Sequence, residues 1–240
     1  MLEPDAITAQ LITNLRGIQQ RILNACLRSS RDQAAVHLIA VTKYAAWPWV
    51  ESLAGLHSEF GENRPQQLSE RQPLLPQIHW HLIGQLQRNK VRLAVRHASM
   101  IHSVDSLRLL EAVADAAHRE QRCPRLLLQV NASLEAAKSG FHPDELPELW
   151  PQVLQIASGL PLVGLMTMAA ETVNSEEARP AFHRLRLLRD ALQNRADSEA
   201  AKVQLLELSM GMSGDFEVAI EEGATLIRLG TAVFCNLEAT

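Results

Sequence analysis

The sequence predicts a (β/α)₈ barrel that forms a single domain over residues 1–240, with an additional helix at its N-terminal end. Short apolar runs alternate with longer helix-like segments, the runs number eight, and no GxGxxG turn follows the first run, as it would in an open doubly wound sheet. The 240 residues, 47% of them hydrophobic, lie in the range in which an α/β barrel is one domain. The open sheet stays as the alternative, because one misplaced strand would change the count of eight.

An amphipathic helix is predicted at the start of the chain, and residues 1–30 are expected to pack on the barrel. The helical pattern begins at Asp5 and runs to Arg28. Within it the apolar residues Ile7, Leu11, Leu15, Ile18 and Ile22 recur at the spacing of one helix face.

Eight candidate strands follow, and helical patterns fill most of the gaps between them. Strands separated by helices are typical of right-handed βαβ units and of a parallel sheet. The candidate strands are His37–Thr42, Glu59–Gly61, His79–Ile83, Ser99–His102, Arg125–Asn131, Pro161–Thr167, Gln204–Ser209 and Thr225–Leu229. The candidate helices between them are Glu51–His57, Pro65–Glu70, Ser106–Glu120, Asp144–Ala157, Glu176–Asn194 and Asp215–Glu222.

The formal charge of −4 comes from acidic and basic residues interspersed along the chain. No basic block could neutralise a row of phosphates, so nucleic acid is not an expected partner. Apolar stretches such as 160–168 are far shorter than a bilayer span, and the N-terminus, with Glu3 and Asp5, lacks a charged-then-apolar leader. We therefore expect a soluble, cytoplasmic protein that makes no contact with a membrane.

Three cysteines, Cys26, Cys123 and Cys235, are present. Their number is odd, and no CxxC or Cys/His spacing accompanies them. We expect reduced thiols, with neither a disulfide framework nor a metal site.

Polar side chains stand at or near the end of every candidate strand. In (β/α)₈ barrels the active residues gather at the carboxyl ends of the strands, so these side chains would converge on one rim. Polar residues also mark the start of ordinary loops, and that interpretation stays open for each one singly. The residues are Lys43, Glu62, Asn63, His81, His102, Ser103, Asn131, Thr167, Ser209 and Arg228.

Lys43 is the residue that loop chemistry explains least well. The chain has four lysines against nineteen arginines, and only Lys43 ends a candidate strand. Strand alternation would place it on the same face as Ile39 and Val41. If that face is the barrel interior, desolvation favours the neutral amine, which can attack an aldehyde and form a Schiff base. The alternative is a lysine that extends from the strand end to solvent.

The last two strand-to-helix junctions are rich in glycine and hydroxyl side chains. They are 209–214, with the sequence SMGMSG, and 228–231, with the sequence RLGT. Backbone N–H groups in such turns can bind an anion, and barrels often bind phosphate after strands seven and eight. Turn and capping chemistry alone would use the same residue types. Together with an aldehyde-binding lysine, the pattern favours a phosphorylated ligand.

These segments resemble the YggS/PROSC family of pyridoxal-phosphate-binding homeostasis proteins, which are similar to the barrel domain of alanine racemase standing alone. The matching stretches run in the expected order over residues 40–234, which is nearly the whole chain. They are AVTK (40–43), FGEN (60–63), WHLIGQLQRNK (80–90), IHSVD (101–105), QVN (129–131), GLMTM (164–168), LSMGMSGDF (208–216) and RLGTAVF (228–234).

The resemblance implies that pyridoxal 5′-phosphate is bound as a covalent aldimine on Lys43. It further implies that Arg228 faces the pyridine nitrogen, that Ser209, Gly230 and Thr231 hold the phosphate, and that three other residues line the ring pocket. Those three are Asn63, His81 and Met166. A guanidinium does not give up its proton, so the pyridine nitrogen would stay neutral and the electron sink of the cofactor would be weakened.

The chain departs from the family pattern at three places. Arg64 stands where many members have tyrosine, Gln85 stands where histidine is frequent, and Cys235-Asn236 follows Phe234 in place of the usual glycine. None of them coincides with the expected lysine, arginine or phosphate residues. The departures therefore concern the rim of the pocket.

The resemblance implies a homeostasis protein that stores the cofactor and delivers it to apo-enzymes without metabolic catalysis. The alternative is a racemase or decarboxylase that depends on the same cofactor. A racemase needs a second acid/base on the opposite face of the substrate, supplied in alanine racemases by a tyrosine of a second domain. The chain ends about where the barrel closes, and strand alternation would turn its only tyrosine, Tyr44, away from Lys43.

A third possibility is a phosphate-sensing or structural barrel that binds no aldehyde, which would leave Lys43 unexplained. The resemblance also implies a monomer or a weak dimer. No heptad pattern or long apolar edge in the sequence decides between those two states.

Overall fold

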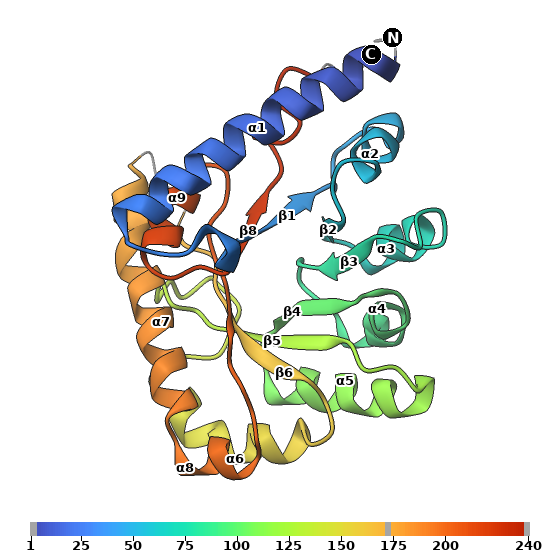
Figure 1. The fold of residues 1–240 in the computed structure, drawn as a ribbon. Coiled ribbons are helices and arrows are strands. Elements are labelled where there is room, and N and C mark those ends of the chain that lie inside the picture. The colour runs from blue at the N-terminus through green and yellow to red at the C-terminus, as the bar shows by residue number, and fades with distance from the viewer. Residues whose placement is uncertain (1–3, 171–173, 238–240) are drawn as a thin grey trace.

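Eight parallel strands close into a barrel in the computed structural model of the chain (Figure 1). Residues 4–170 and 174–237 are described. The strands neighbour one another in chain order, and β8 returns to pair with β1, which confirms the barrel and excludes the open sheet. Their bounds are β1 His37–Val41, β2 Glu59–Glu62, β3 His79–Leu82, β4 Met100–Val104, β5 Arg125–Gln129, β6 Leu162–Met166, β7 Glu207–Ser209 and β8 Leu226–Leu229.

Helices surround the barrel and connect its strands (Figure 1). Two short helices, α4 and α8, were not predicted, and α2 begins at Trp47 rather than Glu51 because Pro48 suits a first helical turn. The helices are α1 Pro4–Arg28, α2 Trp47–Ala54, α3 Pro65–Arg71, α4 Val91–His97, α5 Leu107–Glu120, α6 Leu146–Ile156, α7 Arg179–Gln193, α8 Ala196–Ala200 and α9 Phe216–Glu221. Short 3₁₀ segments add Gln33–Ala35, Arg88–Lys90 and Ser175–Ala178.

The predicted N-terminal helix, α1, packs on the barrel between α9 and α2, beside the seam of β8 and β1 (Figure 1). Its apolar face joins the main hydrophobic core through Leu11 and Ile18. Asn14 Nδ2 donates to the carbonyl of Val233 at 2.9 Å, and Arg21 pairs with Glu217 of α9 at 2.8 Å. These contacts join the two ends of the chain.

The hydrophobic core has two parts, which the alternation of the strands separates. Outward-facing residues such as Ala40 pack under the helices in a large cluster. Inward-facing residues fill the barrel itself, and this inner cluster consists of Ile39, Met100, Leu127, Met166 and Leu226. A barrel interior filled in this way is a packed support for a site at its rim.

Several predicted strand ends were wrong by one to three residues. β1 ends at Val41, so Lys43 lies in a turn beyond the strand. β5 ends at Gln129, and its continuation makes a single bridge from Val130 to Phe141. His81 and His102 lie within β3 and β4, before the last residues of these strands. Their imidazoles are tolerated in the barrel interior because they are hydrogen-bonded to each other.

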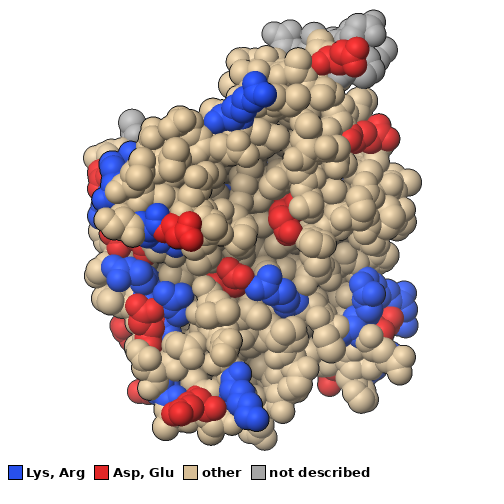
Figure 2. Space-filling view, in the orientation of Figure 1, with Lys and Arg blue, Asp and Glu red and all other residues tan. Residues whose placement is uncertain are grey.

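The surface in Figure 2 carries acidic and basic side chains of both signs, separated by uncharged residues. None of the helices in the described ranges combines the length and the apolar character that a membrane crossing requires. The outer ends of the predicted single domain, residues 1–3 and 238–240, lie outside the described part of the chain.

Candidate functional site

Lys43 lies in a tight turn at the carboxyl end of β1. The turn closes with a hydrogen bond from the Ala45 amide to the Thr42 carbonyl at 2.9 Å, and the Thr42 amide donates to Gly61 of β2 at 3.0 Å. The Lys43 side chain is half-buried. Among the described residues no carboxylate pairs with it, in contrast to Lys138, which pairs with Glu135 at 2.6 Å.

Arg71, the last residue of α3, hydrogen-bonds to the turn that contains Lys43. Arg71 Nη1 donates to the Thr42 carbonyl at 2.9 Å and to Glu62 Oε1 at 2.6 Å, while Nη2 donates to the Ala45 carbonyl at 3.2 Å. The Thr42 hydroxyl also donates to Glu62. Burial raises the pKa of the Glu62 carboxyl, and the hydrogen bonds from Thr42 and Arg71 counteract that rise. A buried ion pair therefore fixes the residues on both sides of Lys43.

Tyr44 does not point away from Lys43, as strand alternation would require. Lys43 Nζ lies 4.9 Å from the centroid of the Tyr44 ring. The prediction was wrong because β1 ends two residues before Lys43, so the alternation no longer applies there. The Tyr44 side chain is 84% exposed, so the ring covers the lysine from the solvent side of the rim.

Arg228 of β8 is a buried cation whose partners are neutral. Its side chain lies inside the barrel at 4% exposure, where Nη1 donates to Ser209 Oγ at 2.6 Å and Nη2 donates to the Thr167 carbonyl at 2.9 Å. Burial lowers the pKa of the guanidinium to about 10, so it stays charged at neutral pH. No carboxylate within the described ranges forms an ion pair with it. A buried charge left in this way is typical of a site that receives an electron-rich ligand group.

A chain of hydrogen bonds continues from Arg228 toward the amino end of the barrel. Ser209 Oγ lies 2.8 Å from His102 Nδ1, and His102 Nε2 lies 2.8 Å from His81 Nδ1. His81 Nε2 lies 2.6 Å from one oxygen of Glu59, at the start of β2. Both nitrogens of His81 are thus engaged inside the barrel, and the structure does not place His81 at the rim.

The turn after β8 lies against the end of β1, and the turn after β7 lies against β8. Ile39 of β1 pairs with Arg228 of β8, and a Cβ on Gly230 would lie only 3.4 Å from the Val41 carbonyl. Gly211, in the turn after β7, has φ of +94°, and its carbonyl accepts a hydrogen bond from the Arg228 amide at 3.0 Å. Only glycine adopts this conformation without strain.

The remaining predicted residues occupy different depths. Asn63 follows β2 and is half-buried, and its backbone touches Gly84 so closely that a Cβ there would lie 2.3 Å from the Asn63 carbonyl oxygen. Met166 is fully buried in the inner cluster, next to Ser209 in the strand register. Thr231 is exposed in the turn after β8. Lys43 thus follows β1, while Arg228 and Gly230 lie on and directly after the neighbouring strand β8, and Met166 belongs to the inner cluster.

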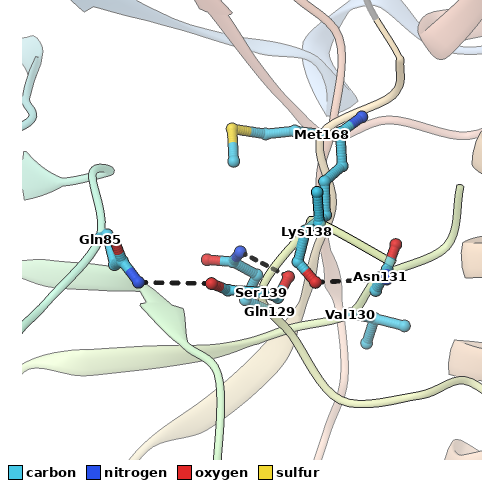
Figure 3. A pocket seen from close by; sticks show the side chains of 8 residues that line it. Gln85, Gln129, Val130, Asn131, Lys138, Ser139 and Met168 are labelled. Carbon is cyan, nitrogen blue, oxygen red and sulfur yellow. Dashed lines mark hydrogen bonds between the residues drawn. The ribbon is translucent and has the colours of Figure 1, made fainter. Parts of the chain in front are cut away.

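A separate hollow of about 210 Å³ lies at the carboxyl ends of β3, β5 and β6 (Figure 3). Gln85 extends across it and donates to Ser139 Oγ at 3.3 Å. Gln129 and Asn131 hold the loop 131–139 through hydrogen bonds to its carbonyls. Neither Lys43 nor Arg228 lines this hollow, which is bordered by Gln85, Gln129, Val130, Asn131, Ala137, Lys138, Ser139 and Met168.

Two other departures from the family pattern lie at the surface. Arg64 is exposed at the start of α3. Cys235 is an exposed free thiol, and its carbonyl accepts a hydrogen bond from Asn14 of α1 at 2.8 Å. Within residues 4–170 and 174–237, neither residue forms a hydrogen bond or an ion pair with Lys43 or Arg228.

Residues 14–237 match the family model for the alanine racemase N-terminal domain. Pyridoxal phosphate homeostasis proteins are similar over most of the chain. The protein of Pseudomonas aeruginosa is 40% identical over 92% of this chain and 93% of its own length. The chain belongs to the family of pyridoxal phosphate homeostasis proteins, as its motifs predicted.

Other members of this homeostasis family match to a similar extent. The protein of Aquifex aeolicus is 37% identical over 92% of this chain and 95% of its own, and the human protein is 35% identical over 92% and 84%. Among solved structures, PipY of Synechococcus elongatus without PLP superposes with a TM-score of 0.77 at 38% identity, covering 90% of this chain and 99% of PipY. PipY has also been solved with PLP bound, and that structure gives a TM-score of 0.75.

Alanine racemase of Clostridium difficile shares the fold of this homeostasis family member. Its TM-score is 0.70 at 14% identity, and the match covers 96% of this chain and 58% of the racemase. Identity at that level establishes the barrel and nothing about activity.

The sequence motifs did not predict the contact of Arg71 with the Lys43 turn, nor the hydrogen bonds of Glu59 and His102 inside the barrel. Arg71 lies on α3 and reaches the Lys43 turn from a helix, so no strand-end rule could identify it. Glu59 opens β2 at the opposite end of the barrel. The available signal was the unusual presence of charged or imidazole side chains at inward positions of short strands.

Proposed function

We propose that the protein stores pyridoxal 5′-phosphate through a reversible covalent bond to Lys43 and delivers it to apo-enzymes, without a metabolic turnover of its own. The names of its relatives and the PLP-bound PipY structure support a cofactor-handling role. When bound, the cofactor would supply an aldehyde, which condenses with a lysine amine and releases one water molecule.

The observation that carries this proposal is the buried, charged Arg228, which forms no ion pair with a carboxylate in the described part of the chain. A pyridine nitrogen has a lone pair in the plane of its ring and can accept a hydrogen bond from a guanidinium. Because Arg228 keeps its proton, such a nitrogen would remain unprotonated. The residue thereby favours storage of the cofactor over carbanion chemistry, for which a protonated ring is the better electron sink.

The phosphate would lie at the turns after β7 and β8. No backbone acceptor within the described ranges takes the amides of Gly230 and Thr231, which makes both available to an anion. Gly230 lies against the end of β1, so a phosphate at Gly230 and an aldehyde at Lys43 suit one small ligand. Asn63 at the rim and Met166 below would complete the ring pocket.

Access to the rim supports delivery. Lys43 is half-buried, and its ammonium group lies over the ring of Tyr44, which is 84% exposed. Water and a recipient amine can therefore approach the bond that must break on release. A catalytic site would instead be expected to exclude water.

We place the protein in the cytoplasm, as a single-domain monomer or weak dimer that contacts apo-enzymes only transiently. The recipients are enzymes that need the same cofactor, and transient contact requires a site free of permanent partners. Sedimentation at several protein concentrations, with and without an apo-enzyme, tests this part of the proposal.

Cofactor transfer is the experiment that tests the function. Holo-protein, freed of unbound cofactor, is mixed with a PLP-dependent apo-enzyme, and the recovered enzyme activity is followed over time. We expect activity to return faster than from an equal amount of cofactor held on serum albumin, an unspecialised amine-bearing protein. If the apo-enzyme draws no cofactor from the holo-protein, the delivery role is refuted.

A racemase or decarboxylase remains the second candidate, because Tyr44 lies next to Lys43 and could act on a proton there. Incubation of holo-protein with amino acids in deuterium oxide distinguishes the two functions. We expect neither deuterium at Cα nor release of carbon dioxide. Exchange that disappears in Tyr44→Phe would favour the enzyme.

A further inference from the structure

A chain of buried hydrogen bonds crosses the interior of the barrel behind Arg228. It runs from Arg228 through Ser209, His102 and His81 to Glu59. The first four side chains are each at most 4% exposed. Buried polar groups without good partners cost several kcal/mol, so a chain of this length requires every donor to meet an acceptor.

The two ends of the chain have fixed roles. Arg228 can only donate, because a guanidinium has no acceptor. Glu59 can only accept at neutral pH. Burial by itself would raise the pKa of its carboxyl, but hydrogen bonds from His81 and His79 outweigh that effect and lower the pKa to about 2.

In a chain whose two imidazoles each carry a single proton, these two ends determine the position of every proton between them. His81 must donate from Nε2 to the Glu59 carboxylate, so a neutral His81 accepts at Nδ1. His102 then donates from Nε2, and because burial keeps the pKa of His102 well below its ordinary value, its Nδ1 carries no proton. Ser209 must therefore donate its hydroxyl proton to His102 and accept from Arg228 with a lone pair.

We propose that Glu59, His81 and His102 are positioning residues that fix the Ser209 hydroxyl as the acceptor for Arg228, so that Ser209 serves the arginine and not the phosphate. This inference rests on the proposed function, since it concerns the residue that would face the pyridine ring. It revises the family-based expectation for Ser209. A hydroxyl whose proton is held by His102 has none to donate to a phosphate dianion.

Two ligands that differ only in the phosphate distinguish the roles of Ser209. The dissociation constants of pyridoxal 5′-phosphate and pyridoxal are measured by imine absorbance for wild type and Ser209→Ala. Free pyridoxal forms an internal hemiacetal to the same extent whichever variant is present, so this reaction cancels from the ratio of dissociation constants between variant and wild type. We expect Ser209→Ala to weaken both ligands by the same factor, about five- to tenfold for one hydrogen bond. A loss confined to pyridoxal 5′-phosphate, or no loss, would overturn the inference.

Two variants of His102 test its positioning role. Asn Oδ1 branches from the side chain where His Nδ1 does, so His102→Asn keeps an acceptor for Ser209, whereas His102→Leu removes it. We expect Leu to weaken both ligands as Ser209→Ala does, and Asn to restore most of the affinity. Equal losses in Asn and Leu contradict the relay. Circular dichroism verifies that each variant is folded.

A measurement on the wild-type protein without ligand is independent of both variants. Long-range proton–nitrogen correlation spectra of protein labelled with ¹⁵N-histidine report which ring nitrogen carries the proton. We expect a proton on Nε2 of His81 and on Nε2 of His102, and none on Nδ1 of His102. A proton on Nδ1 of His102 refutes the direction of the chain. If wild type binds neither aldehyde, the storage function fails instead, and the histidine spectra still decide on the relay.

Discussion

The rim of the barrel and its interior are built differently, although they would bind the same ligand. At the rim, Lys43 and Thr231 lie in turns, are partly or fully exposed, and have few partners. In the interior, Arg228, Ser209 and His102 lie on strands, are buried, and are hydrogen-bonded end to end. Reversible covalent chemistry needs access to water and to a recipient, whereas orientation of a ring needs fixed charges and dipoles. The fold meets the first requirement at the rim and the second in the barrel interior.

The largest expected effect comes from the rim. Lys43→Ala should abolish covalent trapping of the cofactor by borohydride, because no other lysine lies at the carboxyl end of β1. Stability should change by less than about 0.5 kcal/mol, since the side chain is half-buried and forms no ion pair with any described residue. Mass spectrometry after reduction measures the trapping. The matched control is Lys202→Ala, an exposed lysine on the loop before β7. Undiminished trapping in Lys43→Ala would show that the rim does not hold the ligand as proposed.

The second prediction concerns the boundary between the two regions. Arg71→Leu leaves the buried Glu62 carboxylate without its cation and should lower the free energy of unfolding by about 3–5 kcal/mol. The double variant Arg71→Leu/Glu62→Gln should recover most of that loss, because no buried charge is then left unpaired. Urea denaturation measures both. A double variant as unstable as the single one would mean that the ion pair does not account for the effect.

The third prediction tests the interior through its pH dependence. The pKa of Glu59 is lowered to about 2 in the folded protein. Its contribution to stability is therefore fully present above its ordinary pKa of 4.5, and it is lost as the pH falls from that value toward 2. Between pH 5 and pH 3, the unfolding free energy of wild type should fall by about 1–2 kcal/mol more than that of Glu59→Gln. Parallel slopes for the two proteins would mean that Glu59 is not ionised in the chain of hydrogen bonds.

The smallest effect is expected at the outermost part of the rim. Tyr44→Ala removes an exposed ring above the Lys43 ammonium and should cost less than about 1 kcal/mol of stability. Borohydride trapping should persist, with faster release of the cofactor because the bond becomes more open to water. Stopped-flow absorbance after dilution measures the release rate. Slower release in the variant would assign Tyr44 an active part in delivery.

Motif and periodicity predicted the barrel, the helix α1 and the cluster at the ends of β1 and β8. They succeeded because strand and helix periods are local properties and because the ends of parallel strands must meet at one rim. They failed at Tyr44, because β1 ends at Val41 and strand alternation no longer sets the side-chain directions of the two residues in the turn beyond it. The assignment of His81 to the ring pocket stays a prediction, and the structure adds that both of its nitrogens are engaged inside the barrel.

The sequence by itself determined the family, the fold and the presence of Lys43, Arg228 and the glycine turns on neighbouring strands, because all of these depend on residue type and chain order. Only the tertiary structure decided which side chains meet across the barrel. Arg71 reaches the Lys43 turn from α3, and Glu59 is connected to Arg228 through side chains on three other strands. Such contacts depend on register and depth, which barrel closure sets and no local pattern encodes.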